Sequence, residues 1–332
     1  MTGRVKPKRF PWAFILRAVA GAAILTFVLT RVDFSGITLT WDTRARIGFA
    51  LTVIILFFSQ VLSAIRWNLV LGREPTLPFR YLFRIYLIGQ FFSFFLPTSV
   101  GGDAVRAVAV AKVSSRPSWA LSSVVLERVL GLIAMFILLG IGALAAPDVL
   151  NSAIAATTIN FQPTRMHLLL VLAGGMLLFA GFLRIGMRQP RIAQFVREAV
   201  SLWSGLLARP AAGVAAMVTS FLVQLSYIGA WYVLAVALRL PIPAADFLVF
   251  VPFVAIAAML PVTIAGIGLR EGAWVLLLAR HGIPAANAVA YSLLYLVAFL
   301  LIGALGGVAF ALSGIGRADT AVSTPSPVAA KG

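Results

Sequence analysis

The chain has 332 residues, of which 61% are hydrophobic and 11% are charged. Soluble domains carry about twice that share of charged residues, so the composition excludes a water-soluble globular fold. The formal net charge is +17, but the basic residues cluster in short connections between apolar runs. This distribution is typical of membrane proteins and favours anionic lipid, not nucleic acid, as the partner.

Six apolar runs predict helices that cross a lipid bilayer. A helix needs roughly 20 apolar residues to span the hydrocarbon core, and it satisfies its backbone polar groups internally, as that layer requires. We therefore expect an all-α integral membrane protein of about six to eight transmembrane helices. The predicted spans are 12–29, 47–67, 119–146, 166–183, 211–238 and 285–312.

The pattern of the chain divides it into three parts. Arg17 interrupts the first apolar run, which favours an uncleaved membrane helix over a signal peptide. The segment 189–207 has the pattern of an amphipathic helix in the cytoplasmic interface. The predicted parts are a basic cytoplasmic amino terminus (1–11), a transmembrane domain (12–314, with halves 12–146 and 166–314) and a disordered tail (315–332).

An internal repeat relates the two halves. Leu96–Arg106 aligns without gaps with Leu260–Arg270, an offset of 164 residues, and Leu, Pro, Gly and Arg are identical at matched places. Proline interrupts a helix and glycine lets the backbone reverse, so each copy predicts a re-entrant or broken-helix hairpin. The predicted hairpin residues are Pro97, Gly101 and Gly102 in the first copy and Pro261, Gly266 and Gly268 in the second.

The hairpins determine the predicted topology. The first pairs helices over 79–96 and 103–113, and the second pairs 248–260 with 269–278. Each hairpin returns to its own side, so each half makes three crossings and the second half is inverted. With both termini in the cytoplasm, most basic residues fall on the cytoplasmic side of an inner (plasma) membrane. Two hairpins that enter from opposite faces are typical of transporters.

Charged and amide side chains within the membrane part are candidates for the functional site, because each charge costs at least ~2.5 kcal/mol at the bilayer centre. The arginine fork binds phosphate bidentately, so these residues could line a path for an anionic lipid headgroup. Alternatively, the charges pair internally, as Arg128 with Asp103 or Arg106 with Glu127, and only fix the hairpins; both can hold. The candidates are Arg66, Gln90, Asp103, Arg106, Glu127, Arg128, Arg270 and Glu271.

Catalytic and metal sites have little support in the sequence. The chain has no cysteine, and its two histidines lie far apart in sequence. It has no HExxH motif and no P-loop. We therefore expect no metal or cofactor and no catalytic residue.

Four motifs resemble those of a known family. The runs Gly89–Phe92, Gly101–Arg106, Glu127–Gly131 and Gly266–Gly272 are similar to the lysylphosphatidylglycerol synthase transmembrane region, a flippase-like family. The resemblance extends from the first to the sixth span. It implies an inner-membrane protein that moves lipids between leaflets. Larger relatives join this region to a cytoplasmic aminoacyl transferase domain, which we do not expect here because a short tail follows Leu312.

The expected function is translocation of an anionic or modified lipid, or of a lipid-linked precursor, across the inner membrane. Two alternatives stay open. One is a membrane enzyme that modifies phospholipids or polyprenyl lipids. The other is a scaffold that does not transport and instead recruits a cytoplasmic lipid-modifying enzyme through the helix at 189–207.

Overall fold

The computed structural model describes residues 38–72, 77–95, 101–149, 189–259 and 266–313, and the single position 26. Regular structure in this part of the chain is helical, with no strand. The expected fourth span, and the first span apart from position 26, lie outside the described residues. So do the basic amino terminus, the tail, and the prolines Pro97 and Pro261 of the two turns.

Four helices in the described part of the chain are long and apolar enough to cross a membrane: α2 (Thr43–Leu71), α5 (Pro117–Ala145), α9 (Pro210–Ala237) and α12 (Ala285–Ser313). A helix of this length measures about 43 Å. The bounds lie within a few residues of four predicted spans, and the all-α multi-pass class is confirmed. Because α2 continues to Leu71, Arg66 lies within the helix and not at its end.

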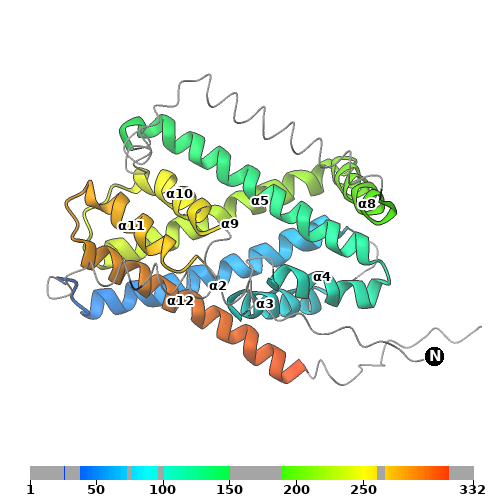
Figure 1. Ribbon diagram of the computed structural model, residues 1–332, viewed down its shortest axis with the longest axis horizontal. Helices are drawn as coiled ribbons and strands as arrows, with labels where there is room; N and C mark the ends of the chain where they lie inside the picture. Colours follow the sequence, from blue (N-terminus) through cyan, green and yellow to red (C-terminus); the bar gives the residue numbers. More distant parts are fainter. Residues whose placement is uncertain are drawn as a thin grey trace, which may run out of the picture.

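The central pair of the bundle is α2 and α9, which pack side by side and run in opposite directions (Figure 1). At one end of the pair, Arg239 Nη2 donates to Asp42 Oδ2 at 2.7 Å. At the other end, Gly72 lies against the guanidinium of Arg209. The start of each helix therefore lies beside the end of the other.

Two helical hairpins enter this bundle from opposite ends (Figure 1). The first consists of α3 (Phe79–Phe95) and α4 (Gly101–Ser114), and it begins at the end where α2 finishes. The second follows α9 through a short 3₁₀ turn, η2 (Ala244–Asp246), and consists of α10 (Phe247–Met259) and α11 (Leu269–Ala279). The two helices of each hairpin pack against each other.

The sequence repeat is an inverted repeat in space. The order α2, α3, α4, α5 recurs as α9, α10, α11, α12, and α3 packs on α12 just as α10 packs on α5. Arg280 Nη1, just before α12, donates to the Asp148 carbonyl, just after α5, at 3.3 Å, so these matched helices are antiparallel. Gly142 and Gly306, 164 residues apart, lie at the two equivalent crossings, where an added Cβ would collide with the facing helix.

The hairpin glycines differ from the sequence prediction in one respect. Gly101 and Gly102 are already helical at the start of α4 and do not form the turn. A Cβ on Gly102 would collide with the Gly89 carbonyl oxygen of α3, so this glycine permits close helix packing. In the second hairpin, Gly266 and Gly268 have φ of +73° and +88°, which fits the predicted turn.

The helix expected over 189–207 is present as α8 (Pro190–Leu207), which packs against α5 and α9. Arg116 Nη2 donates to Glu198 Oε2 at 3.2 Å and joins α8 to the start of α5. Val200 and Leu207 are exposed apolar residues on α8. Such a face suits the membrane interface, which stays a prediction for this helix.

Substitution at two α-helical glycines tests the close packing of the first hairpin. We expect Gly102→Ala to destabilise the protein by about 1–3 kcal/mol, the usual cost of overpacking, because its Cβ meets backbone. Gly140→Ala is the matched control, since nothing lies within 4 Å of its added Cβ. The measurement is thermal unfolding in detergent, followed by tryptophan fluorescence. Equal melting temperatures for the two variants would contradict the observed packing.

Single cysteines test the orientation of the two ends, because the chain contains none. Arg116 and Arg280 are exposed and lie at opposite ends of α5. We expect Arg280→Cys to react with a membrane-impermeant maleimide in intact cells and Arg116→Cys to react only after permeabilisation. Labelling of both from the same side would refute the membrane-spanning placement of α5.

Candidate functional site

Three helices bring five charged side chains together beside the first hairpin. They are Arg66 on α2, Asp103 and Arg106 on α4, and Glu127 and Arg128 on α5; we call them the ion cluster. Glu127 lies ten residues after the start of α5 at Pro117, or about 15 Å along its axis. The cluster therefore lies deep in the apolar part of the bundle.

Glu127 is the centre of the ion cluster. Its side chain is 1% exposed. Oε1 accepts hydrogen bonds from Arg66 Nη2 at 2.7 Å and from the Tyr86 hydroxyl of α3 at 3.1 Å. Oε2 accepts from Arg106 Nη2. One carboxylate thus connects α5 to α2, α3 and α4.

Arg106 is held between two aromatic rings. Its guanidinium carbon lies 4.3 Å from the ring centre of Trp67 and 4.0 Å from that of Tyr86, a cation–π arrangement. Trp67 is fixed in turn by its Nε1, which donates to Ser123 Oγ at 3.1 Å. Gly89 leaves room for the side chain, since a Cβ there would lie 2.7 Å from Arg106 Cγ.

Asp103 binds the fork of Arg128. Arg128 Nε donates to Asp103 Oδ2 at 2.8 Å, and Nη2 donates to Oδ1 at 3.1 Å. Arg106 Nη1 also donates to Oδ1, at 3.3 Å. Asp103 lies in the first turn of α4, where the helix dipole favours a carboxylate. Both pairings that the internal alternative required, Arg128 with Asp103 and Arg106 with Glu127, are present.

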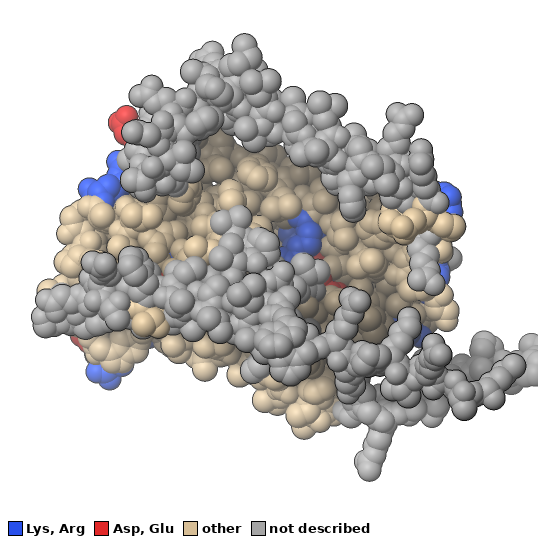
Figure 2. Space-filling view, in the orientation of Figure 1, with Lys and Arg blue, Asp and Glu red and all other residues tan. Residues whose placement is uncertain are grey.

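Arg128 is the exposed member of the ion cluster. Its side chain is 51% exposed, whereas those of the other four members are 10% exposed or less. The face in Figure 2 is hollowed near its centre, and basic atoms lie there with acidic atoms beside them. A polar group that enters the bundle can therefore reach this guanidinium without first separating Glu127 from its partners.

The ion cluster carries more positive than negative charge. Among the described residues, its three guanidiniums face two carboxylates, which leaves an excess of one positive charge. Within the same part of the chain, the buried Nε–H groups of Arg66 and Arg106 have no hydrogen-bond acceptor. Buried polar groups are normally satisfied, so the cluster, as described, is short of both negative charge and hydrogen-bond acceptors.

The described residues do not form a group of metal ligands. Across residues 38–72, 77–95, 101–149, 189–259 and 266–313, no three His, Asp or Glu side chains are grouped as a metal would require. The two carboxylates of the ion cluster are each bound by two guanidiniums.

Arg270 and Glu271 form a separate pair in the second hairpin. Arg270 Nε and Nη2 donate to Glu271 Oε1 at 3.0 and 2.7 Å. Glu271 also accepts from the Gly268 N–H at 2.7 Å and from Ser292 Oγ at 3.1 Å. The pair is neutral and buried, and it fixes the start of α11. Gln90 is partly buried on α3 and, in the described part of the chain, takes no part in either charged group.

Aromatic rings fill the position in the second half that the ion cluster takes in the first. Trp231, matched to Trp67 by the repeat, stacks on Tyr295 with ring centres 3.6 Å apart. Tyr291 stands at the position matched to Glu127, and its hydroxyl donates to the Trp231 carbonyl at 2.6 Å. The sequence indicated the tryptophan match. Nothing in it indicated Tyr86, whose matched residue in the repeat is phenylalanine.

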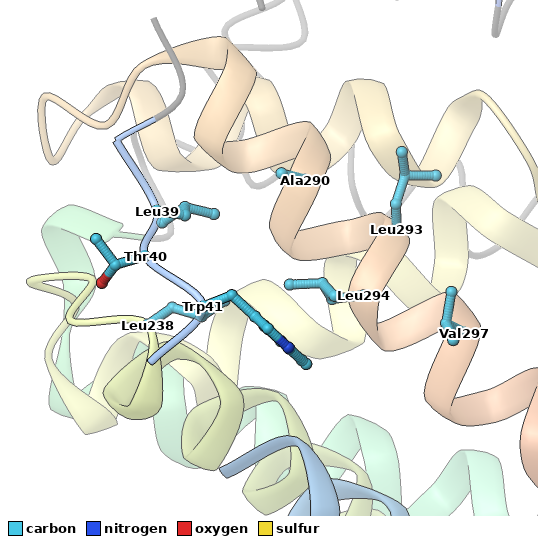
Figure 3. Close-up of a pocket in the computed structure, with 8 residues that line it drawn as sticks. All are labelled: Leu39, Thr40, Trp41, Leu238, Ala290, Leu293, Leu294 and Val297. Atoms are coloured by element: carbon cyan, nitrogen blue, oxygen red, sulfur yellow. The ribbon is translucent and has the colours of Figure 1, made fainter. Parts of the chain in front are cut away.

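A second hollow lies at the other end of α2 and is apolar. It measures about 350 Å³ and is lined mainly by α12, through Leu293, Leu294 and Val297, and by Trp41 and Leu238 (Figure 3). No charged side chain is among its described lining residues. It therefore suits hydrocarbon and does not suit a headgroup.

The antiparallel apolar helices, the broken hairpins and the buried ion cluster define a multi-pass α-helical membrane protein. The sequence model of one protein family, described as the lysylphosphatidylglycerol synthase TM region, matches residues 14–307. The chain belongs to this family, a membrane domain linked to lipid handling. The resemblance of the four motifs is thus confirmed. Neither curated proteins nor solved structures gave a match.

Substitution of Glu127 tests the structural role of the ion cluster. We expect Glu127→Gln to destabilise the protein by about 3–5 kcal/mol, because it leaves the buried Arg66 without a carboxylate and Arg106 with only its longer contact to Asp103. Glu198→Gln is the matched control: it breaks the more exposed pair with Arg116, which contributes at most about 1 kcal/mol. Thermal unfolding in detergent measures both. Similar losses in the two variants would show that Glu127 does not hold the helices together.

Proposed function

We propose that this protein is a lipid translocator that moves an anionic or modified lipid, or a lipid-linked precursor, between the leaflets of the inner membrane. The observation that carries the proposal is the half-exposed Arg128 on a buried cluster with excess positive charge. Lipid headgroups carry phosphate, which an arginine fork binds through two parallel hydrogen bonds. Such a site lowers the cost of bringing a charged headgroup into the bilayer interior.

The inverted repeat supports the same function. Transporters of many folds place discontinuous helices from two inverted halves at the centre of the bundle, and the halves alternate in exposing the site to either side. Here α4 and α11 both begin inside the bundle and enter from opposite ends. Each therefore directs the positive end of its helix dipole toward the interior.

The pairing of the carboxylates makes a lipid-modifying enzyme the weaker alternative. General base catalysis needs a carboxylate that can accept a proton from the substrate. Glu127 instead accepts hydrogen bonds from two guanidiniums and a tyrosine hydroxyl, and Asp103 accepts from two guanidiniums. Neither is free for this role in the described arrangement.

Lipid transfer in a pure system tests the proposal. The protein is reconstituted into liposomes that contain fluorescent phosphatidylglycerol, and dithionite quenches the label in the outer leaflet. We expect the wild type to bring label outward, and Arg128→Gln to slow this by about tenfold or more, the value of one or two charged hydrogen bonds. Arg128→Lys keeps the charge but loses the fork, so an intermediate rate is expected.

Arg116→Gln is the matched control, since it removes an arginine of similar exposure at the surface. Its rate should equal that of the wild type. If Arg128→Gln transfers lipid as fast as Arg116→Gln, the headgroup path does not include Arg128. If mass spectrometry instead finds a chemically altered lipid without transfer, the enzyme alternative replaces the translocator.

A further inference from the structure

This inference rests on the proposed function and concerns the ligand of the same site. We propose that Asp103 is an internal substitute for a phosphate group: its carboxylate occupies the fork of Arg128 in the empty protein, and the phosphate of an anionic lipid headgroup displaces it. The ligand class is therefore a phosphodiester without a compensating cation. Asp103 then acts as a positioning residue that sets the affinity for this ligand.

The contact between Asp103 and Arg128 has the geometry of phosphate recognition. Both oxygens of the carboxylate face the same edge of the guanidinium, at 2.8 Å from Nε and 3.1 Å from Nη2. Two oxygens of a phosphate bind an arginine edge in the same bidentate manner. Because the Arg128 side chain is 51% exposed, a phosphate can reach its guanidinium.

A displaced Asp103 keeps a partner. Arg106 Nη1 already donates to its Oδ1 at 3.3 Å, a longer bond than the one from Arg128 Nε. The first turn of α4 also favours its negative charge in any position of the side chain. The carboxylate can therefore leave Arg128 and bind Arg106 more closely, without becoming a buried unpaired charge.

The charge of the ion cluster matches this ligand. Among the described residues, the cluster has one guanidinium more than it has carboxylates, and a phosphodiester carries one negative charge. The Nε–H groups of Arg66 and Arg106, both more than nine-tenths buried, lack an acceptor within the described residues. The cluster is thus short of hydrogen-bond acceptors as well as of negative charge.

Among its described residues, the second half of the repeat has no equivalent site. The positions matched to Asp103 and Arg128 are Ile267 and Ser292. Arg270, matched to Arg106, is bound by its neighbour Glu271. The proposed phosphate site therefore lies in the first half of the repeat, where α5 meets the first hairpin.

Binding of a soluble short-chain lipid tests the proposal. The purified protein in detergent is titrated with dihexanoyl-phosphatidylglycerol by isothermal calorimetry. We expect Asp103→Asn to tighten binding by about tenfold, since the phosphate no longer competes with an internal carboxylate. Arg128→Gln should lose binding, and adding Asp103→Asn to it should restore none. Asp103→Ser carries the same expectation as Asp103→Asn if the latter fails to fold.

Asp42→Asn is the matched control. It makes the same change of charge, and asparagine still caps the start of α2, as Asp42 does through Oδ1. The site lies 24 residues from Arg66 on the same helix, about 36 Å away, which exceeds the screening length of about 10 Å at 0.1 M salt. No change in affinity is expected. Equal tightening in this control would reduce the effect to net charge and overturn the proposal.

Two further ligands identify the source of the phosphate. Inorganic phosphate should bind at least about tenfold more weakly than the lipid, because it lacks the acyl chains. Dihexanoyl-phosphatidylcholine should also bind more weakly, because its ammonium group opposes the excess positive charge. If inorganic phosphate binds as tightly as the lipid, the site serves free phosphate. If the phosphatidylcholine binds equally well, the charge argument fails.

The proposal and the proposed function can fail separately. If folded Asp103→Asn binds phosphatidylglycerol no more tightly than the wild type while the wild type translocates lipid, the internal substitute is refuted and the translocator stands. If Asp103→Asn tightens binding but the wild type moves no lipid, the phosphate site stands and the translocator falls.

Discussion

The shared carboxylate of Glu127 is the interaction on which the rest of the structure depends. Helix α4 is too short to cross a membrane, so something must hold its first turn inside the bundle. Glu127 does so through Arg106 and at the same time binds Arg66 of α2. The glycines of the hairpin follow from this arrangement. Positions 89 and 102 require glycine because α3, α4 and the Arg106 side chain meet there, and a Cβ would collide with them.

The two halves of the inverted repeat share a scaffold but differ in what fills it. In the first half, Trp67 contacts the guanidinium of Arg106. In the second, Trp231 contacts Tyr291 and Tyr295. Aromatic stacking involves no net charge, whereas the described ion cluster has one guanidinium more than it has carboxylates. Among the described residues, the unbalanced charge therefore lies in the first half, and the second half holds stacked rings and the neutral Arg270–Glu271 pair.

Much of the fold was predictable because apolar length and the Pro, Gly and Arg of the repeat are strong signals. The ion pairs of the cluster could be predicted only as one of two alternatives, internal pairing or a path for a headgroup. The sequence does not show which of several possible partners each buried charge meets. Tyr86 carried no signal, because tyrosine is common in apolar helices. Gly102 was assigned to a turn because glycine serves turns and close packing alike. Arg270 and Glu271 are adjacent yet bonded, because the long arginine folds back at the start of α11.

Stability alone does not account for the composition of the ion cluster. A buried ion pair is often no more stabilising than apolar residues of similar volume, because desolvation offsets the attraction. A third guanidinium without a third carboxylate adds a desolvation cost that no additional ion pair offsets. Within the described residues, the Nε–H groups of Arg66 and Arg106, which have no acceptor, add a further cost. Glu127 and one arginine would be enough to hold the hairpin in place. We propose that the surplus charge serves an anion from outside the cluster, bound at Arg128, the one exposed guanidinium of the five-residue cluster.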